Sequence, residues 1–117
     1  MRNYWSNFWI QGSPELITDL LGVAPTSVRL GQPYDYWDHK IERIGSEDVL
    51  LETFEFLRYI HPRLSALSEK HAYGLLFGTT VSDNGADTFH SLEPSEMKIL
   101  AEMNIPVSFQ TIFQTKD

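Results

Sequence analysis

The segment from Tyr73 to Val81 constrains the fold more than any other part of the sequence, because its alternate positions differ sharply in character. One set of side chains is large or β-branched, and the other set contains two glycines, Gly74 and Gly78. A period of two residues is that of a β-strand with one buried face. The two glycines leave little side chain on the second face, which suits the close approach of another backbone or element.

Four other segments are expected to be strands. Residues 4–11 are rich in aromatic side chains and end at Gly12, and residues 107–113 form the last strand. Residues 27–30 are a short strand. Residues 34–44 alternate imperfectly between apolar and charged side chains, so they are predicted to be an exposed or edge strand.

Two of the predicted helices have well-defined ends. Ser13 is a suitable N-cap, Pro14 loses no hydrogen bond at the first helical position, and Gly22 suits the left-handed position after the last turn. A later helix begins near Pro94, and Asn104 is its expected left-handed cap.

The longest predicted helix begins at Ser46. Its apolar positions recur at intervals of three and four residues, as on one face of a helix. Pro62 is expected to kink or break it, because the proline ring clashes with the preceding turn. The stripe consists of Leu50, Phe54, Leu57, His61 and Leu64.

The resulting order is strand, helix, strand, strand, helix, strand, helix, strand. This order predicts an α+β fold: a mainly antiparallel sheet with helices packed on one face, as in a ferredoxin-like or related sandwich. A length of 117 residues fits a single domain over residues 1–117.

Composition excludes several classes of function. The chain has no cysteine, so disulfides, thiolate zinc sites and cysteine nucleophiles are excluded. Its net charge of −7 argues against nucleic acid and anionic membranes as partners. No segment approaches the roughly 20 apolar residues of a membrane helix, and the N-terminal residues lack the apolar run of a signal peptide. We therefore expect a bacterial-type cytoplasmic protein, whose acidity reflects either solubility or a basic protein partner.

The usual catalytic and metal-binding patterns are missing from the sequence. Asp35, Asp38 and His39 are a candidate metal cluster, but a solvated strand accounts for them better. Residues 83–87 lack the ligand spacing of a calcium loop and favour a turn. We therefore predict no catalytic residues, no metal and no cofactor, and the interpretation leans against an enzyme without excluding one.

The first strand carries the most informative candidates for an interaction surface. Trp5 and Trp9 alternate with the residues expected in the core, so they should lie on the face of the sheet without helices. Together with Tyr36 and Trp37 they would form an exposed aromatic patch typical of an interface. The alternative is that residues 34–44 fold over the tryptophans and complete a second small core.

Several runs of residues can be compared with a known family: 13–18 (SPELIT), 21–26 (LGVAPT), Arg29, Gly31, Trp37, the leucines of the long helix, 92–94 and 100–109. Together they resemble the domain-of-unknown-function family 4279, an uncharacterised bacterial family. The similarity covers nearly the whole chain, but the family has no established activity or site residues to carry over. The segment 34–39 departs from the family, because it is more aromatic and acidic than the Trp-centred turn usual there, and no role is carried over to Trp37.

The leading hypothesis is a small non-catalytic protein-interaction domain, with a homodimer through the aromatic face as one form of it. A narrower form is an immunity-type protein that neutralises a basic toxin. The competing hypothesis is a regulatory domain that binds a small ligand in a pocket lined by Arg29, Trp37 and Tyr73. The sequence leaves the identity of any partner or ligand open.

Overall fold

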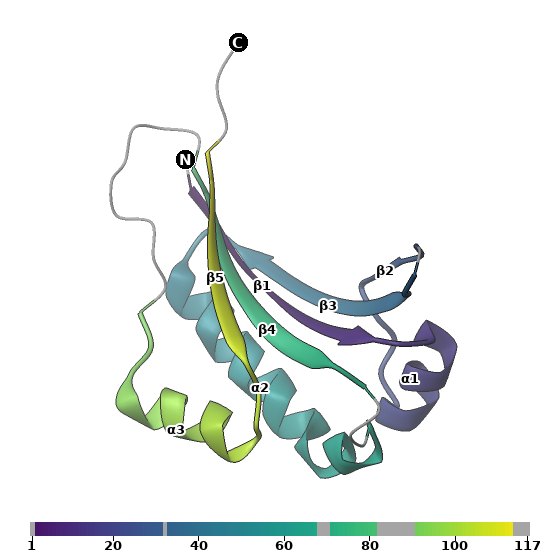
Figure 1. The fold of residues 1–117 in the computed structure, drawn as a ribbon. Coiled ribbons are helices and arrows are strands. Elements are labelled where there is room, and N and C mark those ends of the chain that lie inside the picture. The colour runs from purple at the N-terminus through teal and green to yellow at the C-terminus, as the bar shows by residue number, and fades with distance from the viewer. Residues whose placement is uncertain (1, 32, 68–70, 82–90, 114–117) are drawn as a thin grey trace.

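The computed structural model describes residues 2–31, 33–67, 71–81 and 91–113. The predicted α+β class and the predicted order of elements are confirmed (Figure 1). The elements are β1 (Arg2–Gln11), α1 (Pro14–Leu21), β2 (Ser27–Arg29), β3 (Tyr36–Arg43), α2 (Ser46–Leu64), β4 (Tyr73–Val81), α3 (Pro94–Glu102) and β5 (Val107–Phe113).

The five strands form one sheet in the order β2-β3-β1-β4-β5. The first four pair antiparallel, and β5 pairs parallel to β4. Through β4 this is the ferredoxin-like β-α-β-β-α-β arrangement, to which α3 and β5 add one more strand. The prediction of an exposed or edge strand at residues 34–44 holds in part: β2 pairs with β3 only over residues 36–38, whereas Lys40, Glu42 and Arg43 are exposed and have no strand of the described chain on that side.

The core lies between the sheet and the helices, which all cover the same face of the sheet (Figure 1). Sheet residues such as Phe8, Ile10, Trp37, Leu75 and Phe77 contact the apolar faces of the helices there. Burial of apolar area on this one face is the main stabilising contribution to the fold. The opposite face carries no helix in the described part of the chain, and it is called the open face below.

The predicted left-handed residues are found at the ends of two helices. Gly22 has φ 71° after α1, and its N–H donates to the Thr18 carbonyl at 2.8 Å. Asn104 has φ 54° after α3, and the following N–H of Ile105 donates to the Leu100 carbonyl at 3.0 Å. Such a residue reverses the chain so that the next apolar side chain returns to the core.

The other helix predictions are met in part. Ser13 stands at the N-cap of α1, but its side chain makes no capping hydrogen bond. Helix α2 continues through Pro62 and ends two residues later at Leu64, followed by a short 3₁₀ turn, Ser65–Leu67. Pro62 has no N–H to donate to the preceding turn, and the helix extends only two residues beyond it. The turn predicted at residues 83–87 lies outside the described residues.

Candidate functional site: the open face of the sheet

The register of the strands determines which residues share the open face. Trp9 of β1 lies opposite Asp38 of β3 on one side and Gly74 of β4 on the other. Cross-strand partners point to the same side of a sheet, and successive residues of a strand point to opposite sides. The open face therefore carries Trp5, Asn7, Trp9 and Gln11 from β1, Tyr36, Asp38, Lys40 and Glu42 from β3, and Arg29 from β2.

The two tryptophans of β1 lie over the two glycines of β4. The indole of Trp5 occupies the space above Gly78, and a Cβ on Gly74 would meet Cζ2 of Trp9 at 2.7 Å. Trp5 is only 6% exposed, its Nε1 donates to Thr80 Oγ1 at 3.3 Å, and Trp9 is half-buried. The predicted orientation away from the helical core is confirmed, and the space left by the glycines is filled by indole rings.

Residues 34–44 do not fold over the tryptophans. Strand β3 pairs edge to edge with β1, with Gln11 opposite Tyr36 and Tyr4 opposite Arg43. It contributes side chains to the open face but forms no second layer above it. The expectation of a second small core is therefore wrong.

Trp37 does not belong to the predicted patch. Its side chain is fully buried on the helical side, where its Nε1 donates to Thr18 Oγ1 at 3.1 Å. The reason is the strand period: because Tyr36 points to the open face, its neighbour Trp37 must point to the core. Of the four residues predicted for an exposed patch, the open face brings together Trp5, Trp9 and Tyr36, but Trp5 is buried, so the prediction of its exposure is wrong.

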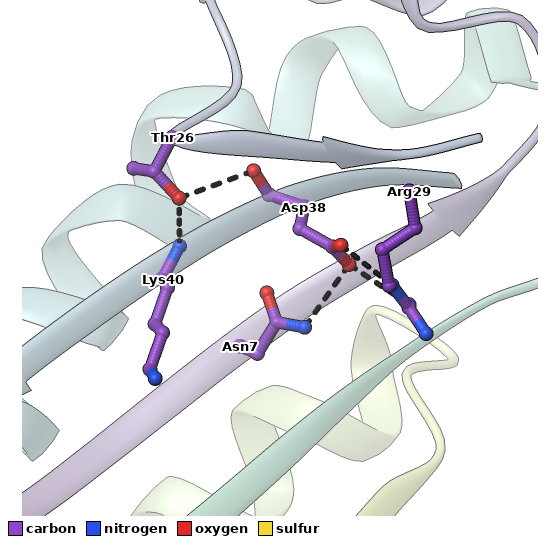
Figure 2. Close-up of polar contacts among 5 residues, drawn as sticks. All are labelled: Asn7, Thr26, Arg29, Asp38 and Lys40. Carbon is purple, nitrogen blue, oxygen red and sulfur yellow. Dashed lines mark hydrogen bonds and ion pairs between the residues drawn. The ribbon is translucent and has the colours of Figure 1, made fainter. Parts of the chain in front are cut away.

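Asp38 is the polar centre of the open face (Figure 2). Its carboxylate side chain is only 4% exposed and accepts three hydrogen bonds, from Arg29 Nε at 2.7 Å, Arg29 Nη2 at 2.9 Å and Asn7 Nδ2 at 3.0 Å. The two bonds from Arg29 form the paired geometry that gives a guanidinium–carboxylate contact its direction. Hydrogen bonding to Asp38 raises the pKa of Arg29, so the guanidinium stays charged.

Thr26 holds the backbone around this centre. Its hydroxyl donates to the Asp38 carbonyl at 3.3 Å and accepts from the Lys40 N–H at 2.8 Å (Figure 2). Its own N–H donates to the same Asp38 carbonyl at 2.9 Å. These bonds tie the start of β2 to β3, so a strand of three residues still presents Arg29 in a defined position.

Arg29, Tyr36 and Trp9 form a stacked group that we call the arginine–aromatic cluster. The guanidinium carbon of Arg29 lies 4.3 Å from the centre of the Tyr36 ring, and the rings of Tyr36 and Trp9 meet edge to face at 6.2 Å. A cation over an aromatic face is stabilised by the ring quadrupole. The Arg29 side chain remains 56% exposed, so the cluster is both ordered and accessible.

The cluster borders a shallow hollow of about 300 Å³ on the open face. Within it, Asn7 has a buried Oδ1 with no hydrogen-bond partner among the described residues. The hollow therefore combines aromatic walls with polar groups able to orient a bound group. It is lined by Asn7, Trp9, Gln11, Arg29, Tyr36 and Leu76.

The pocket predicted from Arg29, Trp37 and Tyr73 is not formed. Arg29 lies on the open face, whereas Trp37 and Tyr73 lie on the helical side. The Tyr73 ring packs 5.9 Å from that of Phe8, and its hydroxyl donates to the Met103 carbonyl at 3.5 Å. The sheet itself separates these residues, which the sequence could not show without the register.

The described residues contain no group of three or more histidine, aspartate or glutamate side chains placed to hold a metal ion. Asp38 is instead bonded to Arg29, and His39 points to the opposite side, where its ring stacks on Phe56 at 3.9 Å. No helix of the described chain is long and apolar enough to cross a membrane.

Charge is distributed unequally between the two layers. The helices contain eight acidic and three basic residues, whereas the strands contain two acidic and four basic residues. The net charge of −7 is thus concentrated away from the sheet. The acidic residues of the helices are Glu15, Asp19, Glu47, Asp48, Glu52, Glu55, Glu96 and Glu102.

Sequence reasoning missed Asn7 and misjudged Asp38, which is a buried partner of Arg29 rather than a solvated strand residue. Asp38 lies among aromatic and acidic residues in the sequence, and that context carries no signal of its burial. The burial of Asp38 follows from the pairing of β2 with β3. That pairing places Ser27 opposite Asp38 and Arg29 opposite Tyr36, so that Arg29 reaches the Asp38 carboxylate.

Comparisons with protein-family models, curated proteins and solved structures found no match to this chain. The resemblance to domain-of-unknown-function family 4279 therefore stays a prediction.

Proposed function

We propose that this protein is a non-catalytic interaction domain that binds a protein partner on its open sheet face, and that the partner is a second copy of the chain. The observation that carries the proposal is the arginine–aromatic cluster of Arg29, Tyr36 and Trp9, ordered on a sheet face that no described helix covers.

The composition and rigidity of the cluster support this role. Tryptophan, tyrosine and arginine are the residues most enriched among those that dominate binding energy at protein interfaces. Asp38 holds Arg29 through two hydrogen bonds, and Arg29 packs over Tyr36. Binding to side chains that are already held in place loses less conformational entropy than binding to mobile ones.

The charge distribution supports a second copy as the partner. Two chains that each carry −7 repel one another, and the repulsion is strongest where the acidic helices would meet. A pair that docks through the open faces keeps both helical layers on the outside. Arg29 of the cluster and Lys40, whose Nζ lies 5.1 Å from the Trp5 ring, then lie near the interface, where they balance the charges of Asp38 and Glu42 on the same face.

Sedimentation velocity over a range of protein concentrations tests the proposal. Wild type should sediment as a dimer at high concentration, and Tyr36→Asp should shift the protein to monomer while its circular dichroism is unchanged. Leu51→Asp is the matched control, because Leu51 is 60% exposed on α2, and this variant should still dimerise. A wild type that stays monomeric at every concentration would show that a second copy is not the partner.

The hollow beside the cluster favours a second candidate, a regulatory domain that binds a small ligand. Arg29 would bind an anionic group, while the unpartnered Asn7 Oδ1 would accept a hydrogen bond from a donor on the same ligand. A thermal-shift screen of small carboxylates and phosphates distinguishes the two. Stabilisation that disappears in Arg29→Ala supports the ligand, and the absence of any shift removes it.

A further inference from the structure

The sheet ends in two edge strands that differ greatly in how they are protected. Strand β2 has only three residues, and a very short edge strand offers little backbone for pairing. Strand β5 has seven residues, VSFQTIF, with no charge and no proline. Native edge strands are usually blunted by lysine, proline, bulges or a covering element. Strand β5 contains neither lysine nor proline, so its own sequence does not block pairing at this edge.

The geometry of β5 leaves part of its backbone directed away from the sheet. The N–H of Leu75 donates to the Pro106 carbonyl at 2.8 Å, and β4 and β5 then run parallel in register. In such a ladder alternate residues of a strand bond to one neighbour, so the backbone groups of Val107 and Phe109 point to the outer side. No strand of the described chain pairs there.

An apolar groove of about 570 Å³ lies beside this edge, between α3 and β5. Met97 on α3 is 51% exposed and Phe109 on β5 is 52% exposed, although both are large apolar side chains. A strand added at the edge of β5 would direct every second side chain to the helical side of the sheet, toward this groove. The backbone edge and the groove therefore suit the same extended ligand.

Acidic residues outnumber basic ones on the helix that forms one wall of the groove. Glu93, Glu96 and Glu102 lie on or beside α3, against a single basic residue, Lys98. A second copy paired through β5 would bring two such acidic helices to the same side of one continuous sheet, where they would repel. A ligand with basic ends would be attracted instead.

We propose that the outer edge of β5 and the α3–β5 groove bind an extended peptide segment of another protein as a sixth strand. The segment has apolar side chains at alternate positions, which enter the groove, and basic residues at its ends, which the acidic residues on and beside α3 attract. Main-chain hydrogen bonds to β5 supply affinity, and the groove supplies specificity. This surface is separate from the open face and does not depend on the function proposed for it.

Selection from a random-peptide display library tests the proposal. The library is first depleted on Met97→Asp, which places a charge in the groove, and then selected on wild type. The enriched peptides should show apolar residues at every second position and lysine or arginine at the ends. Fluorescence anisotropy with one enriched peptide should show that Met97→Asp weakens binding by about tenfold or more. Hydrogen exchange of the β5 amides should slow when the peptide binds.

Two control variants separate this surface from the open face. Tyr36→Asp and Leu51→Asp should bind the peptide as wild type does. Failure to enrich any peptide, enrichment with helical spacing, or binding that Met97→Asp does not weaken would overturn the proposal. It would also be overturned if wild type self-associates and Met97→Asp alone abolishes that association, because a second copy would then occupy the edge.

Discussion

The indole ring of Trp5 lies on Gly78 of the neighbouring strand and takes the space that a side chain at that position would need. Trp9 and Gly74 repeat the relationship four residues along both strands. Glycine inside a strand is normally destabilising, but an aromatic ring from the adjacent strand can cover it. The open face is therefore ordered by tryptophan–glycine pairs although no second layer covers it.

We expect Gly78→Ala to destabilise the protein. The new methyl group would collide with the Trp5 ring and displace its Nε1 from Thr80 Oγ1, at a cost of about 1–3 kcal/mol. Urea unfolding followed by tryptophan fluorescence measures the change. Gly31→Ala is the matched control, because the nearest atom to its Cβ would be the Tyr34 carbonyl oxygen at an ordinary 3.6 Å. Equal stability of Gly78→Ala and wild type would show that Trp5 does not need this space.

Ser6 and Thr53 form a buried hydrogen bond between the sheet and α2. Their hydroxyl oxygens are 2.6 Å apart, and both residues are 1% exposed. Thr53→Val alone leaves the Ser6 hydroxyl without its partner and should lower the free energy of unfolding by about 1–3 kcal/mol. The double variant Ser6→Ala/Thr53→Val removes both polar groups and should recover part of the loss. A double-mutant cycle from chemical unfolding measures the coupling, and additive effects would contradict it.

Arg29→Ala should destabilise the protein through Asp38. The variant leaves the buried Asp38 carboxylate with Asn7 as its remaining side-chain donor. We expect the free energy of unfolding to fall by about 1–3 kcal/mol, and the loss is no larger because the Arg29 side chain is largely exposed. Arg29→Lys should restore only part of this, since an ammonium group cannot form the two parallel hydrogen bonds. Thermal and urea unfolding compare the three proteins. A lysine variant as stable as wild type would show that charge alone is sufficient.

His39 should make stability depend on pH near neutrality. Burial lowers the pKa of His39, and its Nδ1 has no hydrogen-bond partner among the described residues. The unfolded chain, with a histidine pKa of about 6.5, therefore binds a proton more readily than the folded chain. The contribution of neutral His39 to the free energy of unfolding should be fully present above about pH 6.5. It should decrease as the pH falls from there toward the lower pKa of the folded state.

Urea unfolding of wild type and His39→Phe at several pH values measures this contribution. Phenylalanine retains the stacking on Phe56 but cannot be protonated, so the difference between the two proteins should change across this range. A difference in stability that is independent of pH would show that His39 has the same pKa in the folded and unfolded chains.

Local signals predicted the helix ends correctly where one residue decides the conformation. Gly22 and Asn104 adopt positive φ because glycine and asparagine tolerate it, whatever surrounds them. The strand at residues 34–44 was predicted only in part, because its pairing with β2 over residues 36–38 depends on a second segment that the strand's own sequence does not contain. The pocket of Arg29, Trp37 and Tyr73 failed for the same reason.

The sequence by itself determined the elements of this protein, their order and the two faces of each strong strand, because hydrophobic period, caps and turn residues act over a few positions. It was sufficient to place Trp5 and Trp9 on the side of β1 away from the core. Only the tertiary structure decided that these rings lie on Gly78 and Gly74, that Asp38 is buried beneath Arg29, and that Trp37 is in the core. These contacts join residues on different strands, and they exist only once the register of the sheet is set.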